Sequence, residues 1–145
     1  MRLRCQKAAL LVAVATISCT GPSEPSSISA HLVLTDVDGR ALPATTGMPG
    51  QTLVSGNMSL DQAGGAVISE DWIDEGGTHF TRTFLYIYTI KNSNITFDYA
   101  IPCGINANCA PPPTGRVLDN GLHVQVVYSP GYVFQTYNYR VAATP

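Results

Sequence analysis

Charge is scarce in this chain of 145 residues, of which 12% are Asp, Glu, Lys or Arg, against a usual share of roughly 25%. Because 45% of the residues are apolar, the composition excludes an intrinsically disordered chain, which has the opposite balance. The formal net charge of −2 provides no basic footprint for nucleic acid. Outside the extreme N-terminus no apolar run reaches the ~20 residues of a membrane-spanning helix, which excludes a polytopic membrane protein.

The chain also lacks the motifs that indicate catalysis or cofactor binding. It contains no G-x-S-x-G nucleophile elbow, no P-loop, no G-x-G-x-x-G dinucleotide fingerprint and no H-E-x-x-H zinc motif. We therefore expect a protein that is not an enzyme and that holds no cofactor or metal. An enzyme of unrecognised type is the less favoured alternative.

The N-terminal segment has the organisation of a secretory signal. It begins with three basic residues, Arg2, Arg4 and Lys7. The short apolar stretch 8–17 follows, and a small residue then precedes Cys19. This order resembles the lipobox of bacterial lipoproteins, so we expect residues 1–18 to be a lipoprotein signal peptide and Cys19 to carry the lipid. Cleavage after residues 13–15, which satisfy the A-x-A rule, is the alternative.

The residues after Cys19 predict a tethered domain. Residues 19–28 are rich in Pro and Ser and have no apolar periodicity, which is typical of a tether for the folded domain, residues 29–145. Loss of the signal removes three of the eight basic residues and none of the ten acids, which leaves a mature charge of −5. Because an acidic domain is not attracted to anionic lipids, its attachment must depend on acyl chains. We expect an exported, lipid-anchored protein of the bacterial cell envelope, on the outer membrane or its periplasmic face.

Two cysteines remain in the predicted domain. Cys5 is discarded with the signal, whereas Cys103 and Cys109 lie in one loop of an exported protein, where disulfides persist. We expect a Cys103–Cys109 disulfide. A redox or metal role is disfavoured, because the pair lacks C-x-x-C spacing and has no neighbouring His.

From position 29 onward apolar and polar residues alternate, and no helical period of 3.6 is present. In one segment, for example, Ile95, Phe97, Tyr99 and Ile101 share a face. Gly, Asn and Asp mark short turns of the kind that join antiparallel strands. The expected strands are residues 30–37, 52–60, 66–73, 80–90, 95–101, 122–128 and 133–141. Such a pattern predicts an all-β domain of roughly eight antiparallel strands, as an up-and-down barrel whose closure removes exposed edges, or as a sandwich.

Three short motifs carry a resemblance to a known group. Residues 37–43 read Val-Asp-Gly-Arg-Ala-Leu-Pro, residues 50–60 place Gly and Leu at recurring positions, and residues 137–140 form an aromatic-Arg strand. The domain therefore resembles small bacterial lipocalin-like lipoproteins. The resemblance implies an eight-stranded barrel on a lipid anchor and implies no activity. The G-x-W signature of true lipocalins is absent, since the single Trp is Trp72.

Aromatic residues are concentrated in the predicted strands. They could fill the narrow interior of an eight-stranded barrel, or line one end of it and hold an apolar or sugar-like ligand. In residues 84–88 both faces of the strand are apolar, so we expect Phe84, Tyr86 and Tyr88 to form an exposed patch or a covered outer face for a partner. The expected partners are the membrane, through the lipid anchor only, and a small apolar ligand or an envelope protein.

Two further sets of residues invite a functional interpretation. Four carboxylates lie within residues 70–75 beside a Gly-Gly turn, but without the spacing of a calcium loop, which favours a solvated hairpin end over a weak cation site. The histidines lie on three different predicted strands with no metal-binding spacing, so we expect satisfied or solvent-facing side chains. They are His31, His79 and His123.

Overall fold

The structure is a computed structural model that describes residues 27–102, 109–129 and 134–142. The predicted signal peptide, the lipidation candidate Cys19, most of the tether and Cys103 lie outside the described residues.

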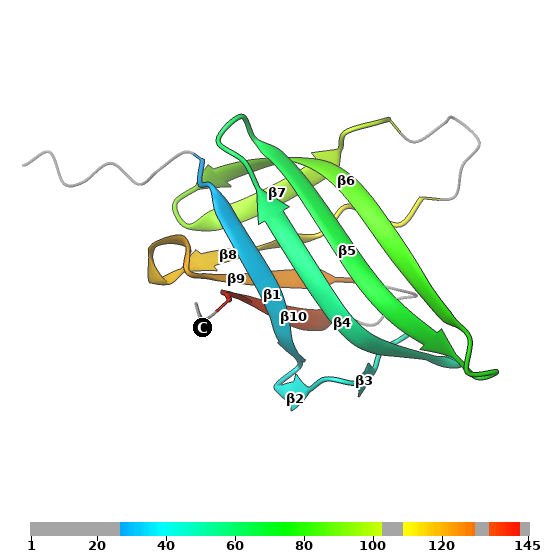
Figure 1. Cartoon of the computed structure of the whole chain (residues 1–145). Coiled ribbons are helices and arrows are strands. Elements are labelled where there is room, and N and C mark those ends of the chain that lie inside the picture. The colour runs from blue at the N-terminus through cyan, green and yellow to red at the C-terminus, as the bar shows by residue number, and fades with distance from the viewer. Residues whose placement is uncertain (1–26, 103–108, 130–133, 143–145) are drawn as a thin grey trace, which may run out of the picture.

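Eight strands form a closed, antiparallel, up-and-down barrel, which confirms the predicted fold class (Figure 1). Each strand pairs with its neighbours in sequence, and β1 closes the ring by pairing with both β4 and β10. Three short elements lie outside the eight barrel strands: the two-residue strands β2 (Arg40–Ala41) and β3 (Ala44–Thr45), and the 3-10 helix η1 (Asp119–Gly121). The barrel strands are β1 (Ala30–Val37), β4 (Gln51–Leu60), β5 (Gly65–Asp74), β6 (His79–Lys91), β7 (Asn94–Tyr99), β8 (Thr114–Leu118), β9 (His123–Tyr128) and β10 (Gln135–Val141).

The period-two alternation of each strand decides which side chains enter the barrel. On β6 the side chains of Tyr86 and Tyr88 are 4% and 3% exposed, whereas Leu85 and Ile87 are 48% and 53% exposed. The expectation of an exposed aromatic patch at Phe84, Tyr86 and Tyr88 is therefore wrong, because all three rings belong to the inward row. The rings instead pack into the core, where a fully buried large side chain contributes about 1.5–3 kcal/mol.

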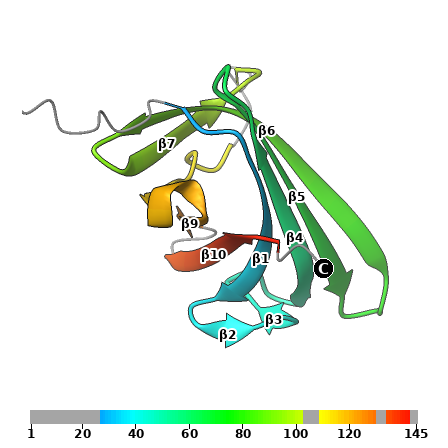
Figure 2. The same ribbon diagram turned by 60° about the vertical axis from the view of Figure 1, so that its left-hand side comes forward.

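The two ends of the barrel are built differently. We call the end where β1 begins the upper end, and the end that carries β2, β3 and the β5–β6 turn the lower end (Figure 1). In Figure 2, β4, β5 and β6 form one long curved wall, with β9 and β10 across the interior from them. The chain enters the barrel at the upper end, through Ile28.

Tight turns form where the sequence places residues that tolerate a positive φ. The two-residue turn between β1 and β2 consists of Asp38 and Gly39, with φ of 51° and 74°. Mirror-image turns of this kind match the twist of paired strands, and Asp-Gly is a favoured sequence for them. The expectation that Gly, Asn and Asp mark short turns between antiparallel strands is confirmed at this position.

Some strand boundaries differ from the prediction. β7 ends at Tyr99, and Ile101, which was expected to share a strand face with Ile95, Phe97 and Tyr99, lies beyond the strand and is 73% exposed. β8 was not among the expected strands, because it is only five residues long and contains Gly115. Gln135, a polar residue in the otherwise aromatic inward row of β10, is buried.

Candidate functional site

A carboxyl group lies inside the barrel, on the inner face of β5. The inward row of that strand is Ala66, Ile68, Glu70 and Trp72, and Glu70 is only 3% exposed. Burial raises the pKa of Glu70 to about 7, although the hydrogen bond from Trp72 and the charge of Arg82 lower it in part. The indole Nε1 of Trp72 donates to Glu70 Oε2 at 3.2 Å. The four carboxylates of residues 70–75 therefore do not all lie at a solvated hairpin end, because the first of them, Glu70, points into the core.

Arg82 occupies the position directly opposite Glu70 on β6. Its guanidinium lies 5.1 Å from the ring centroid of Trp72 and 5.2 Å from that of Phe80, within the range of cation–π attraction. It also donates to Gln51 Oε1 at 2.9 Å and contacts the Met48 sulfur at 2.7 Å.

Glu70 and Arg82 do not form an ion pair, since no contact within 4.0 Å joins their charged groups. Opposite charges at directly opposed positions of a sheet ordinarily pair. Here the Trp72 indole holds the carboxyl, while Met48, Gln51 and two aromatic rings hold the guanidinium. Two unlike charges on neighbouring strands are thus kept apart on the inner face of the barrel.

Tyrosines from three strands lie within electrostatic reach of the Glu70 carboxyl. Burial raises the pKa of four tyrosines, and the nearby charge of Glu70 contributes to each increase; they are Tyr86, Tyr128, Tyr137 and Tyr139. The hydroxyls of Tyr128 and Tyr139 are fully buried and lie near one another, but neither makes a hydrogen bond of good geometry within the described residues. Buried hydroxyls are nearly always hydrogen-bonded, so these two are exceptions that require an explanation.

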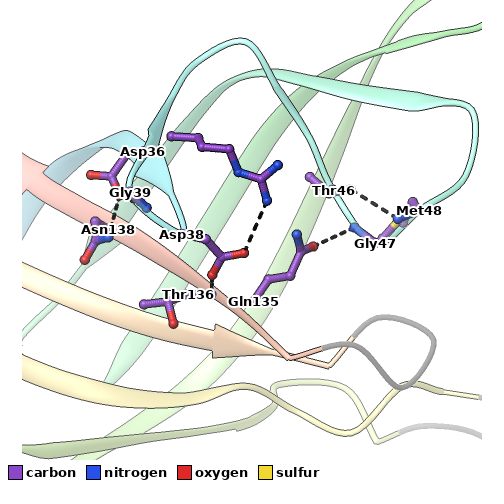
Figure 3. A network of polar contacts seen from close by, with 10 residues as sticks. Asp36, Asp38, Gly39, Thr46, Gly47, Met48, Gln135, Thr136 and Asn138 are labelled. Carbon is purple, nitrogen blue, oxygen red and sulfur yellow. Dashed lines mark hydrogen bonds and ion pairs between the residues drawn. The ribbon is translucent and has the colours of Figure 1, made fainter.

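A loop between β3 and β4 crosses the lower end of the barrel; we call residues 46–50 the covering loop. Gly47 N donates to Gln135 Oε1 on β10 at 2.7 Å (Figure 3), and Met48 contacts Arg82 on β6. β6 and β10 are four positions apart in the ring of eight strands, on opposite sides of the barrel. The covering loop therefore spans the lower mouth. A hollow of about 360 Å³ beside it is lined by residues 45, 46, 48–52, 74 and 75.

A polar network fixes the neighbouring β1–β2 turn to β10 (Figure 3). Asp38 N donates to the Thr136 carbonyl and Thr136 N donates to Asp38 Oδ1, both at 2.8 Å. Asp36 Oδ1 accepts from Gly39 N at 3.0 Å and from Asn138 Nδ2 at 2.6 Å. These carboxylates are used to hold the backbone of the lower end in place.

The upper end is occupied by the entering chain. Ile28 packs against the core and lies close to Gly121, and Tyr88 binds its backbone. A hollow of about 280 Å³ beside Ile28 is lined by residues 28, 90, 93 and 116–121. The polar part of the interior is therefore at the opposite end of the barrel from the point where the tether would leave.

The other residues singled out in the sequence do not gather into a site. His79 is exposed, and His123 is buried with its Nε2 3.1 Å from Asn138 Oδ1. No group of three or more His, Cys, Asp or Glu side chains within the described ranges could hold a metal ion. Asp71, the neighbour of Glu70, points outward, and hydrogen bonds from Ser55 and Thr81 lower its pKa.

The structure also brings together a Ser–His pair that the sequence did not indicate. Ser59 Oγ lies 2.6 Å from His31 Nδ1, on the exposed face where β1 and β4 pair. A nucleophilic Ser requires a base that a third group orients. His31 has no other hydrogen bond to a side chain in the part of the chain that the structure describes. We therefore regard the contact as a cross-strand pair on the surface.

Glu70 and Arg82 are the site residues that sequence reasoning missed. The sequence pattern that could have identified Glu70 is the period-two alternation. Glu70 stands at every second position with Ala66, Ile68 and Trp72, which are all apolar, so it lies on the same face of the strand.

Comparison with known proteins adds no relative: no protein-family model, no curated protein and no solved structure matches this chain. Over the described ranges, none of the helical segments has the length and apolarity needed to cross a bilayer.

Proposed function

We propose that this protein is a lipid-anchored, non-enzymatic barrel of the cell envelope that binds a small ligand in the lower half of its interior. The observation that carries the proposal is a group of buried polar side chains: Glu70, whose pKa is raised by burial, and Tyr128 and Tyr139, whose hydroxyls lack a hydrogen bond of good geometry. An interior that served only as a structural core would leave few such groups unpaired, because each costs about 1–3 kcal/mol. Convergent polar groups within apolar walls are the usual composition of a ligand site.

The geometry at Glu70 favours binding over catalysis. A carboxyl with a raised pKa is a common general acid, so this residue is also the strongest argument for an enzyme. A catalytic acid acts together with a nucleophile or a base. The groups near Glu70 are aromatic rings, hydroxyls and Arg82 rather than a nucleophile with its base.

The position of the tether supports an anchored orientation. Residues 20–27 separate the lipidation candidate Cys19 from Ile28 and span at most about 30 Å when extended. Ile28 is at the upper end, so acyl chains on Cys19 would hold that end toward the membrane. The covering loop and the hollow beside it would then face away from the bilayer, toward a soluble ligand.

A second function is favoured by the outer face of the barrel. Val67 on β5 and Leu85 on β6 are directly paired, and together with Ile87 they form an exposed aliphatic group. Exposed apolar side chains on adjacent strands are typical of protein-binding surfaces when they form a continuous patch. In this alternative the barrel interior is inert and an envelope protein docks on β5 and β6.

Native mass spectrometry distinguishes the two functions. The chain is exported with its own N-terminal segment, purified gently and compared with the Glu70→Gln variant. We expect an additional mass that is lost on denaturation and is reduced in the variant. A bare mass for both proteins, with an envelope protein that co-purifies unless Leu85 and Ile87 are changed to Thr, would contradict ligand binding and support the alternative.

Anchoring is tested independently by fractionation. The Cys19→Ala variant is expected in the soluble fraction, because it lacks the thiol that takes the lipid. Cys5→Ala, within the predicted signal, is the matched control and is expected to remain with the membrane. Unchanged membrane association of Cys19→Ala would show that the anchor is elsewhere.

A further inference from the structure

The separated charges on β5 and β6 indicate the chemistry of the ligand. Glu70 and Arg82 are directly opposed, and both side chains lie on the inward row, yet neither group has an oppositely charged partner within 4.0 Å among the described residues. The separation is built in by other contacts: Trp72 donates to the carboxyl, and Gln51 accepts from the guanidinium. A carboxyl and a guanidinium are thus held as two distinct binding groups.

We propose that Glu70 and Arg82 together bind a small zwitterion, a molecule that carries one ammonium and one carboxylate group. This inference rests on the proposed function and specifies its ligand. The ammonium donates to Glu70, and the carboxylate accepts from the planar N–H groups of Arg82, which match a carboxylate in two-point geometry. The hydroxyls of Tyr128 and Tyr139, which lie near one another without a hydrogen bond of good geometry, are further donors and acceptors in the interior.

A ligand of one charge would match Glu70 and Arg82 less well. An amine alone would neutralise Glu70 but add a second cation beside Arg82. An acid alone would bind Arg82 but add a second anion beside Glu70. Only a molecule with both charges satisfies the two groups without introducing a like-charge contact, which in a poorly solvated interior is costly.

Access to Arg82 is through the covering loop. Met48 and Gln51, the residues that contact the guanidinium, also line the hollow of about 360 Å³ at the lower end. A small molecule in this hollow reaches the guanidinium by displacing either contact. Both of these acceptors are neutral, whereas the carboxylate of a ligand is ionised and can accept from two N–H groups of the guanidinium at once.

The test uses a series of linear amino acids in which the separation of the charges increases. Glycine, β-alanine, 4-aminobutyrate and 5-aminopentanoate are each compared with the alkylamine and the alkanoate of the same chain length. Binding to the processed, full-length protein, freed of bound ligand, is measured by calorimetry at pH 7. We expect at least one zwitterion to bind at least tenfold more tightly than both of its single-charge analogues.

Variants assign each charge to its residue. In Glu70→Gln the zwitterion should bind no better than its alkanoate, and in Arg82→Gln no better than its alkylamine. Asp71→Asn, which removes the neighbouring outward carboxylate, is the matched control and should keep the tenfold preference. Arg82→Lys keeps the positive charge but loses the planar guanidinium, and it replaces Arg82→Gln in the test if that variant fails to fold. In Arg82→Lys the zwitterion should exceed its alkylamine in affinity by less than in the wild type.

Several outcomes would overturn the inference. Equal binding of a zwitterion and its amine would show a cation site at Glu70 alone, and equal binding of a zwitterion and its acid would show an anion site at Arg82 alone. If no zwitterion binds although native mass spectrometry shows a carried ligand, the inference fails and the proposed function stands. If no probe binds and no ligand is carried, both fail.

Discussion

Two hydrogen bonds join Tyr88 on β6 to Ile28, where the chain enters the barrel. Both are made by the Tyr88 hydroxyl, one with the backbone N–H of Ile28 and one with its carbonyl oxygen. Tyr88 Oη accepts from Ile28 N at 2.9 Å and lies 2.7 Å from the Ile28 carbonyl oxygen, to which it donates. The same hydroxyl is 2.7 Å from the Asp61 carbonyl oxygen. One phenol therefore fixes both the entering chain and the β4–β5 turn at the upper end.

Tyr88→Phe should release the entering chain. The change leaves the backbone N–H and carbonyl of Ile28 without this partner, which should lower the free energy of unfolding by about 1–2 kcal/mol. Urea denaturation measures the loss, and faster hydrogen exchange at the Ile28 amide locates it. Tyr99→Phe is the control, because that hydroxyl donates to the Ala110 carbonyl in an exposed position. An equal loss in both variants would contradict a special role for Tyr88.

The stability of the barrel should fall as pH rises toward neutrality. Burial raises the pKa of Glu70 to about 7, whereas glutamate in an unfolded chain titrates near about 4.3. Between these values the folded state retains a proton that the unfolded state has lost, so the stabilisation is complete below about pH 4 and lost as pH passes 7. The loss from Glu70 should reach about 3 kcal/mol.

Denaturation of wild type and Glu70→Gln at pH 5 and pH 8 checks this sign. The neutral amide of the variant should be the more stable form at pH 8, and the difference should shrink at pH 5. Asp71→Asn should follow the wild-type profile, since Asp71 is on the outer face and its pKa is lowered rather than raised. A wild-type protein that gains stability relative to Glu70→Gln as pH rises would show that the carboxyl is paired with a cation.

Gly115→Ala should disrupt the barrel. A Cβ at this position on β8 would overlap the backbone carbonyl oxygen of Gln125 on the paired strand β9. Because neither strand can move away without breaking the ladder, we expect a loss of about 3 kcal/mol or more in the free energy of unfolding. Gly76→Ala is the control: its nearest neighbour is the flexible Asp74 side chain at 3.3 Å, so thermal unfolding should change little. Similar melting temperatures for both variants would show that β8 and β9 are less closely paired.

The Cys103–Cys109 disulfide remains a prediction, because Cys103 lies outside the described residues. Maleimide labelling of the mature lipidated protein, which by the proposed processing has lost Cys5 and carries the lipid on Cys19, followed by mass measurement, should show no reactive thiol before reduction and two after it. Closing so short a loop should stabilise the fold by roughly 2–2.5 kcal/mol, which reduction would remove. Two labelled thiols in the unreduced protein would rule out the bridge.

The sequence predicted the fold class well because hairpin turns and period-two alternation are local signals. It predicted the facing of β6 poorly, since apolar residues occupy both rows between positions 84 and 88. The polar members of the row that contains Leu85 and Ile87 would have decided the question: Thr81, Thr83 and Thr89 mark it as the outer row. β8 escaped prediction because a five-residue strand that contains glycine has too short a pattern to recognise.

The site itself depended on information that the sequence contains only in part. Parity alone places Glu70 among inward residues, but the composition of residues 70–75 suggested a solvated turn. The relation of Glu70 to Arg82 requires the β5–β6 register, and the convergence of tyrosines from β6, β9 and β10 requires closure of the ring. Properties of this kind belong to the tertiary structure rather than to any single segment.

The pairing of β1 with β10 also sets the order in which the chain can complete its structure. Leu32 is the register partner of Val141, so the first barrel strand to be synthesised must wait for the last. The hairpins from β4 to β7 involve neighbouring segments and can form early, whereas the β1–β10 ladder must close over a loop of about a hundred residues at a high entropic cost. Until that step β1 and β9 each retain an unpaired edge. Chains truncated before Gln135 should therefore be the aggregation-prone form of this protein, and a chaperone of the exported chain would protect β1 for longer than any other strand.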